Sequence, residues 1–449
     1  MTRLLLDRSP FGARALVVDE GGPVAFGFAD RTAGDTVTER LFLGRVTGEA
    51  AELDALFVDI GLDRPALLPL REIELIEGPR PAAGSGVIVQ GRRPAREGKG
   101  PRVGADLALP GFGLVRHPRR TGLQVSARLG REARKALLAR GRALFGAAAG
   151  LTLRAQAERL DDDRLRAEAA ALDGQWRALL AQAARGRPGP LGLPAAPELD
   201  LLRRHLRPDT DRIEAEAGLL AAARRTLAEA GWTAGIDLAA ADPTDAIEEA
   251  LALAVDPVLP LAGGGRLLIE PTAALTAIDV DAGPAAGQGR DALNREAVEA
   301  AIRAAAQRNL GGTIVIDLVD PGGARAWAAV ETALRTALAR DPTPCRYALV
   351  RPMGLAVLSR ARSGPSLTER LLAAGRAAPA WQAVRLWHAL RRALPPAQEV
   401  RVAPDLHAFL IGPGREAWAA GLEELGYRPQ ISLGSPSDPD FELLPTSPS

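Results

Sequence analysis

The alternation of apolar and polar residues is clearest between residues 266 and 321. Two apolar runs, RLLIE and ALTAIDVDAG, have the composition of strands and meet at Pro271-Thr272. Residues 290–312 repeat apolar side chains at helical spacing and end in a glycine pair, after which the run TIVID follows. Strand, helix and strand in this order predict a parallel crossover unit, with acidic residues where the strands end.

Three aspartates occupy these strand ends. Asp279 and Asp281 are two positions apart, so a strand points both to the same face, and Asp317 ends the next predicted strand. If the strands pair, the three carboxylates converge and repel one another unless a cation binds them. Oxygen ligands of this kind suit magnesium or manganese, and a bound divalent ion can activate water against a phosphodiester. The alternative is that the aspartates only cap the turns after the strands.

The rest of the chain alternates between strand-like and helical segments. Residues 2–30 have the pattern of successive strands joined at Gly21-Gly22, and several short strand-like runs between residues 36 and 110 are typical of a small barrel. Residues 186–200 are rich in Pro and Gly and indicate a connector. The pattern therefore predicts several domains that contain both strands and helices.

Composition narrows the classes of protein that fit. With 449 residues, 47% of them apolar and 25% charged, the chain has room for about two to four globular domains. Its net charge of +1 means that attraction to nucleic acid would come from local basic patches. The single cysteine, Cys345, excludes an internal disulfide and a multi-cysteine zinc site within one chain.

Several functions are not indicated because their sequence signals are missing. The chain has no GxxxxGK[ST], HExxH or GxSxG motif, so nucleotide hydrolysis, zinc proteolysis and serine hydrolysis have no support. No apolar run is long enough for a signal peptide or a bilayer span. We therefore expect a cytoplasmic protein with no membrane partner.

Three segments make the chain similar to a known family. IEPTAALTAIDVDAG, LNREAVEAAIRAAAQRNLGGTIVIDLVD and RPMGLAVLSRAR resemble, in order and spacing, the catalytic region of the ribonuclease E/G family. The resemblance implies an endoribonuclease, a phosphodiester hydrolase that cleaves single-stranded RNA with magnesium held by Asp279 and Asp317. Asp281 stands where the family commonly has Asn and adds charge beside the metal. Arg351 matches an arginine near the family's active site, where it would neutralise charge on the attacked phosphate.

The resemblance also implies a fold class. It is a multidomain α+β and α/β chain, in which a ribonuclease-H-like subdomain carries an inserted OB-fold barrel and precedes a DNase I-like catalytic α/β domain and a small C-terminal α/β domain. The implied boundaries are 1–35 and 191–255 for the ribonuclease-H-like parts, 36–110 for the OB-fold, 111–190 for a 5′-sensor region, 256–370 for the catalytic domain, 371–435 for the C-terminal domain and 436–449 for a disordered tail.

RNA contacts are implied on the barrel. Phe57 matches an aromatic that the family stacks on bases, whereas Leu67 stands where a second aromatic is expected, which would weaken stacking by about 1–3 kcal/mol. Arg92, Arg93 and Lys99 belong to a local basic run in the same domain. The alternatives are that Phe57 belongs to the barrel core and that the basic run is a solvated loop.

A pocket for a terminal 5′ monophosphate is implied in the sensor region. Gly122 and Arg154 fit the family's glycine and arginine, and Arg154 can form a fork on phosphate. Ala155 replaces the expected threonine and has no hydroxyl to donate. The departure makes 5′-end sensing an open question at this stage.

Other family features are missing from the sequence. No cysteine follows the third matching segment, so we expect neither zinc nor a zinc-linked dimer, and a homodimer would form through other surfaces. The chain has no long Arg-rich or acidic tail, so we expect no degradosome scaffold, and in length it is closer to the ribonuclease G branch. Two interpretations remain: a magnesium-dependent endoribonuclease of RNA processing (ribosomal RNA included) or decay, and a catalytically weakened RNA-binding protein that retains the fold. A purely structural α/β protein is a third.

Overall fold

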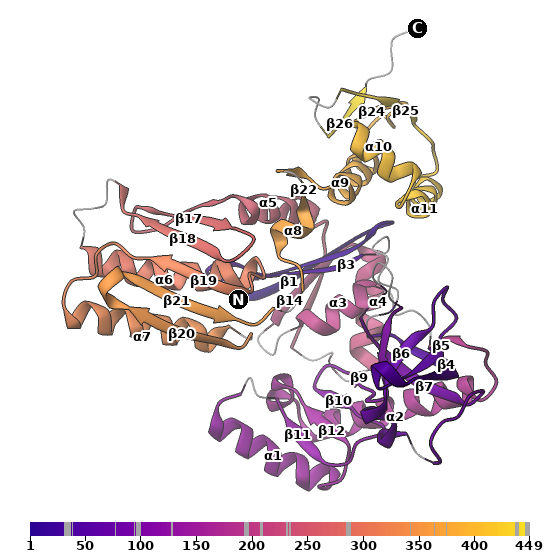
Figure 1. Cartoon of the computed structure of the whole chain (residues 1–449). Coiled ribbons are helices and arrows are strands. Elements are labelled where there is room, and N and C mark those ends of the chain that lie inside the picture. The colour runs from indigo at the N-terminus through magenta and orange to yellow at the C-terminus, as the bar shows by residue number, and fades with distance from the viewer. Residues whose placement is uncertain are drawn as a thin grey trace. The chain divides into compact units, whose positions relative to one another are not determined.

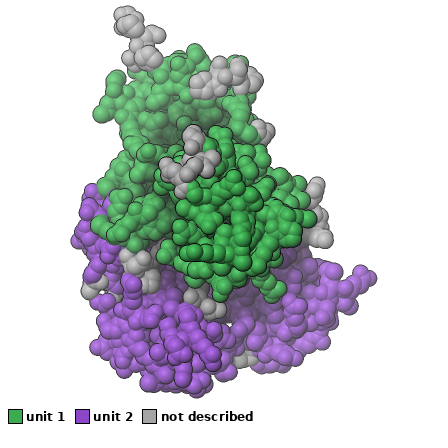
Figure 2. Space-filling view, turned by 90° about the vertical axis from the view of Figure 1, so that its left-hand side faces the viewer, with its two compact units in different colours: residues 1–28, 241–449 green, residues 29–240 purple. Residues whose placement is uncertain are grey.

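The computed structural model describes the chain except for residues 31–36, 38, 77, 94, 96–99, 127–128, 193–196, 207–209, 230–231, 233–234, 284–288, 342, 363, 374, 436–439 and 445–449. The described part forms two compact units, which are coloured separately in Figure 2. Unit 1 contains residues 1–28 and 241–449, and unit 2 contains residues 29–240. Among the described residues, no helix is long and apolar enough to cross a membrane.

Unit 2 contains a closed five-stranded barrel (Figure 1). Its strands pair in the order β4-β5-β6-β8-β7, and pairing of β7 with β4 closes the ring. Alternate side chains, among them Phe42, Val58 and Leu68, fill the core. The small barrel predicted for residues 36–110 is therefore confirmed. The strands are β4 (Leu41–Ala50), β5 (Ala55–Asp59), β6 (Ala66–Pro69), β7 (Gly86–Arg93) and β8 (Arg102–Gly104).

The remainder of unit 2 is a second small sheet with helices beside it. Helices α1 and α2 pack on a sheet of order β11-β12-β10-β9, and β14 and β15 pair in parallel within another sheet. The elements are β9 (Leu109–Pro110), β10 (Leu114–Arg116), β11 (Leu123–Val125), α1 (Arg131–Phe145), β12 (Leu151–Leu153), α2 (Asp162–Ala183), β13 (Gly189–Pro190), α3 (Pro197–His205), β14 (Thr210–Ala215), α4 (Ala217–Glu229) and β15 (Asp237–Ala240).

The central sheet of unit 1 has six strands in the order β16-β17-β18-β19-β21-β20. Helices α6 and α7 pack on one face of this sheet in a single apolar core, which contains Ile278, Ile316 and Trp327. The predicted strand–helix–strand unit is present, with α6 between the parallel strands β18 and β19. The elements are β16 (Val258–Pro260), β17 (Arg266–Pro271), β18 (Thr276–Asp281), α6 (Arg290–Gln307), β19 (Gly312–Asp317), α7 (Ala324–Arg340), β20 (Cys345–Val350) and β21 (Leu355–Arg360).

Unit 1 also contains the N-terminal strands and a small C-terminal sheet of order β25-β24-β26. Phe441–Leu444 form β26 and pair with β24, so the prediction that residues 436–449 are a disordered tail is wrong for this segment. The elements are β1 (Thr2–Ser9), β2 (Gly12–Asp19), β3 (Gly22–Asp30), α5 (Thr244–Val255), α8 (Leu367–Leu371), β22 (Leu372–Ala373), β23 (Arg376–Ala377), α9 (Pro379–Arg392), β24 (Glu399–Val402), α10 (Pro404–Ile411), α11 (Arg415–Leu425), β25 (Gln430–Leu433) and β26 (Phe441–Leu444).

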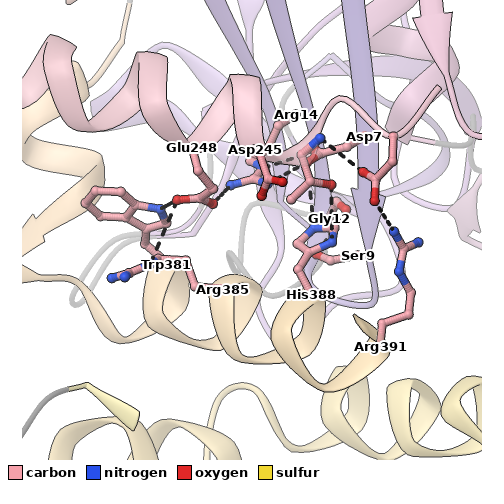
Figure 3. Close-up of polar contacts among 12 residues, drawn as sticks. Asp7, Ser9, Gly12, Arg14, Asp245, Glu248, Trp381, Arg385, His388 and Arg391 are labelled. Carbon is pink, nitrogen blue, oxygen red and sulfur yellow. Dashed lines mark hydrogen bonds and ion pairs between the residues drawn. The ribbon is translucent and has the colours of Figure 1, made fainter. Parts of the chain in front are cut away.

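A buried ionic cluster joins four of these elements (Figure 3). Arg14 of β2 is 5% exposed, donates through Nε to Asp7 of β1 at 3.1 Å, and forms an ion pair with Glu248 of α5. From α9, Trp381 donates to Glu248 at 3.1 Å, and His388 lies 3.6 Å from Asp7. Burial lowers the pKa of His388 to about 3, so its ring is neutral at pH 7. Arg14 is therefore the cation on which the cluster depends.

Replacing Arg14 by Met tests this dependence. The change leaves the Asp7 carboxylate, 1% exposed, without its cation, and losing one partner of a buried pair costs about 3–5 kcal/mol. We expect the free energy of unfolding in urea to fall by that amount. Arg8→Met removes an exposed pair with Glu424 and should cost at most about 1 kcal/mol. Equal losses in the two variants would contradict the assignment.

Candidate active site

Asp279 and Asp317 are direct partners in the pairing of β18 with β19, which lie side by side in Figure 1. Adjacent strands lie about 4.8 Å apart, and both side chains are exposed on the face away from α6 and α7. Their neighbours Ile278 and Ile316 point into the core beneath the helices. The alternation of each strand and the parallel register together set two carboxylates beside each other.

Asp281 does not join this pair, contrary to the prediction that three carboxylates converge. Its Oδ2 accepts from Arg266 of β17, with Nη2 at 2.8 Å and Nε at 2.9 Å, and its Oδ1 accepts from the Gly283 amide at 2.9 Å. The Gly283 hydrogen bond and then the Arg266 contact hold the pKa of Asp281 below its ordinary value. In the described part of the chain, no group of three or more His, Cys, Asp or Glu side chains could hold a metal ion. The predicted convergence of three carboxylates is therefore wrong.

The chain that follows Asp317 is held from two sides. Asn294 of α6 is fully buried, donates through Nδ2 to the Val319 carbonyl at 2.9 Å, and accepts at Oδ1 from the Val319 amide at 3.0 Å. The Leu318 amide donates to the Gly354 carbonyl at 3.1 Å. These bonds fix the backbone directly after the carboxylate, so Asn294 orients the site although it does not line it.

Arg351 lies in a turn at the same end of the sheet. The short 3₁₀ segment η5 (Arg351–Met353) connects β20 to β21, and Leu355 at the start of β21 is the register partner of Asp317. Gly354 closes this turn with φ 73°, a conformation that glycine adopts without strain. The exposed Arg351 guanidinium is thus carried by the loop next to the acid pair.

The acid pair fits a magnesium ion by its chemistry. Mg²⁺ commonly binds one or two protein carboxylates and completes its shell with water and substrate phosphate oxygens. Asp279 and Asp317 offer two exposed carboxylates near the ends of the central strands β18 and β19, where those further ligands have access. Manganese accepts the same oxygen donors.

On the barrel, the structure places Phe57 outside the core. Phe57 and Leu67 are register partners on β5 and β6, both half-buried, while Val58 and Leu68 fill the interior. The alternative that Phe57 is a core residue is therefore wrong.

The basic run predicted beside this face is only partly present. Arg92 donates to the Asp106 carbonyl and has the Asp106 carboxylate 3.9 Å away. Arg93 ends β7 and is exposed, and Lys99 lies outside the described residues. Arg92 and Arg93 are both exposed at the end of β7, and Arg92 is engaged by Asp106.

The structure does not bring Gly122 and Arg154 to one point. Gly122 precedes β11 and Arg154 follows β12, and because these strands are parallel the two residues lie at opposite ends of the pair, about 13 Å apart along the strand. Arg154 instead donates from Nη1 to the Gly111 carbonyl at 2.7 Å. This register does not support the prediction that Gly122 and Arg154 line one phosphate pocket. The sequence could not specify the register.

A residue that the sequence analysis missed, Glu168, fixes the same turn. This α2 residue is 2% exposed and accepts from the backbone amides of Phe112 and Gly113, the latter at 3.0 Å. Burial raises its pKa to about 7, against the opposing effect of these hydrogen bonds. The available signal was its spacing, because Glu168 falls on the buried face of α2 between Leu165 and Leu172.

Together these features define a class of protein: a mixed α/β multidomain chain with a closed five-stranded barrel and, in its other unit, paired carboxylates on an α/β sheet. The chain belongs to the ribonuclease E/G family, whose model matches residues 108–363.

Similar proteins carry the names of both branches of the family. Ribonuclease E of Nostoc sp. is 30% identical over 366 residues, 73% of this chain and 52% of that protein. Ribonuclease E of Escherichia coli is 30% identical over 368 residues, 73% of this chain and 34% of that protein. Ribonuclease G of Salmonella typhimurium is 27% identical over 403 residues, 81% of this chain and 80% of that protein. The chain spans about half the length of the Synechocystis and Nostoc ribonuclease E relatives.

Asn294→Ala tests the anchoring of the loop after Asp317. The change leaves the buried Val319 amide and carbonyl without their partner, which costs about 1–3 kcal/mol for each group. We expect lower stability in urea and faster hydrogen exchange of the Val319 amide. Glu299→Ala, on the exposed face of the same helix, should change stability by less than about 0.5 kcal/mol. Unchanged exchange at Val319 would refute the anchor.

The titration of Glu168 should appear in the pH dependence of stability. Because its folded pKa of about 7 lies above the ordinary 4.5, the folded state binds the proton more tightly, and this contribution is complete below pH 4.5 and lost as the pH rises to 7. It amounts to about 3 kcal/mol. In Glu168→Gln the decline in unfolding free energy between pH 5 and pH 7 should be smaller than in the wild type, as measured in urea. Identical slopes would show that Glu168 does not titrate there.

Proposed function

We propose that this protein is a magnesium-dependent endoribonuclease that cleaves single-stranded RNA in RNA processing or decay. The observation that carries the proposal is the register of Asp279 with Asp317 on adjacent parallel strands. The names of the relatives, ribonuclease E and ribonuclease G, support the reaction class.

In this proposal each site residue has a stated task. Asp279 and Asp317 hold the ion, which when bound supplies an activated water and neutralises charge on the phosphodiester. Arg351, on the turn beside β21, approaches the attacked phosphate and stabilises its added negative charge. Arg266 pairs with Asp281 and keeps that carboxylate oriented and neutralised at the edge of the site. The products carry a 5′ phosphate, as the family resemblance implies.

RNA is gripped by the outer face of the barrel in unit 2. Phe57 is half-buried there and offers a ring for base stacking, and Arg93 on β7 adds a cation to the barrel surface. The binding of a 5′ monophosphate through Gly122 and Arg154 does not form part of the proposal, because the structure separates these residues. Zinc has no role in it, since the chain contains one cysteine.

The second interpretation, an RNA-binding protein without cleavage, draws on the ion pair of Asp281 with Arg266 and on Leu67 in the barrel row. In this interpretation the barrel binds RNA and no metal ion is needed. The two interpretations differ in one measurable respect, which is whether bound RNA is cut when magnesium is added.

Asp279→Asn and Asp317→Asn separate these interpretations. Each removes a carboxylate that neutralises and orients the ion, a loss of several kcal/mol of transition-state stabilisation, so cleavage should fall by about 10²–10⁴-fold. Asp281→Asn should have a smaller effect, because Asp281 is occupied by Arg266. The assay is cleavage of a labelled single-stranded RNA with magnesium and with a chelator added.

Asp291→Asn, at the exposed start of α6, is the matched control for the loss of one carboxylate and should cleave like the wild type. RNA binding by the wild type without magnesium-dependent cleavage would favour the second interpretation. Full cleavage by Asp279→Asn or Asp317→Asn would overturn the proposed site.

A further inference from the structure

Four outward-facing residues form a continuous row across the barrel, which we call the barrel row: Phe57, Leu67, Arg102 and Arg93. On adjacent strands, Phe57 pairs with Leu67, Leu67 pairs with Arg102, and Arg102 pairs with Arg93. Neighbouring strands lie about 4.8 Å apart, so the side chains of the row form one strip. It begins with an aromatic ring, passes an aliphatic side chain and ends with two guanidinium groups.

Arg102 is available for a ligand at this position. Its side chain is exposed, and within the described residues it forms neither an ion pair nor a side-chain hydrogen bond. The next residue, Val103, is completely buried in the barrel core, which fixes the direction in which Arg102 leaves the strand. The Leu67 amide donates to the Pro101 carbonyl at 2.9 Å and fastens the start of β8 to β6.

Arg92 differs from Arg102 in the contacts of its guanidinium group. Arg92 also lies on the barrel surface, but its guanidinium is engaged by the carbonyl and carboxylate of Asp106. Arg102 stands directly beside Leu67, where the strip lacks an aromatic ring. A guanidinium is planar, stacks on aromatic faces and carries a charge, so it can serve both a base and the adjacent phosphate.

We propose that the Arg102 guanidinium stacks on a base of single-stranded RNA next to the base held by Phe57. It supplies at this point of the barrel row the flat contact that Leu67 does not provide. The proposal rests on the proposed function for the identity of the ligand, and it adds a residue that determines affinity rather than cleavage. In this proposal, Arg102 raises the affinity for RNA more through stacking on the base than through its charge alone.

The test measures RNA binding separately from cleavage. The 449-residue chain carrying Asp317→Asn, which is expected to slow cleavage by about 10²–10⁴-fold, is titrated with a chelator present against a fluorescein-labelled single-stranded decamer at several salt concentrations. In this background Arg102→Ala should weaken binding by about 5- to 100-fold, the range for loss of one base stack. Arg71→Ala, an exposed arginine of the same unit outside the barrel row, should change it by less than about twofold. Far-ultraviolet circular dichroism confirms that each variant is folded.

Two further variants separate stacking from charge. Arg102→Lys keeps the charge and the salt dependence but loses the plane, so its binding should remain well below that of the parent. Leu67→Phe should restore binding to Arg102→Ala by a larger factor than it gains in the parent, because a ring then replaces the missing stack.

Other results would overturn the proposal. Binding by Arg102→Lys equal to the parent would reduce Arg102 to a charge, and binding by Arg102→Ala equal to Arg71→Ala would remove it from the interface. Equal effects of Leu67→Phe in both backgrounds would also contradict it. If wild-type protein does not cleave RNA but Arg102→Ala weakens binding as expected, the proposed function fails and this inference stands. If wild-type protein cleaves RNA but Arg102→Ala binds like Arg71→Ala, this inference fails and the proposed function stands.

Discussion

The parallel pairing of β18 with β19 is the constraint on which the rest of the site depends. The other pairings of this six-stranded sheet are antiparallel, and β18 and β19 run parallel because α6 carries the chain back across the sheet. Two carboxylates in register on adjacent strands repel each other in the absence of a cation. The exposed position of Asp279 and Asp317 at the same level of the sheet suits a metal ion.

Single buried polar residues hold the connections around this framework. Asn294 fixes the loop after β19, Glu168 fixes the turn at Gly113, and Arg14 binds the N-terminal strands to α5. In each case the side chain satisfies groups that no strand or helix can pair, which a buried segment requires. The cost is that each connection depends on one residue, since removing either partner leaves a polar group desolvated.

The sequence predicted the parts that depend on local periodicity. The strand–helix–strand unit, the barrel and the strand positions of Asp279 and Asp317 follow from apolar spacing and from glycines such as Gly312, which has φ 93° at the start of β19. The ion pair of Asp281 depends on the register of the hairpin that brings Arg266 opposite it. The register of strand pairing is set by turn geometry and by burial across the sheet. The spacing of residues along one strand does not specify it.

The same limit explains the sensor region and the C-terminal strand. Gly122 and Arg154 match a pattern of residue types, but the parallel pairing of β11 with β12 sets them at opposite ends. Phe441–Leu444 are a short apolar run within a polar segment and become a strand because β24 has an edge to pair with. Both outcomes are decided by a partner strand rather than by the segment itself.

Two departures from the family resemblance are matched by neighbours on adjacent strands, and this bears on the choice between cleavage and simple binding. The extra negative charge of Asp281 is cancelled by Arg266, its register partner. The aromatic ring missing at Leu67 has an exposed guanidinium, Arg102, beside it in the barrel row. A site released from function has no physical reason to acquire such pairs, because neither an exposed ion pair nor an unpaired arginine adds much to stability. These neighbours on adjacent strands therefore support the proposed endoribonuclease over the interpretation without cleavage.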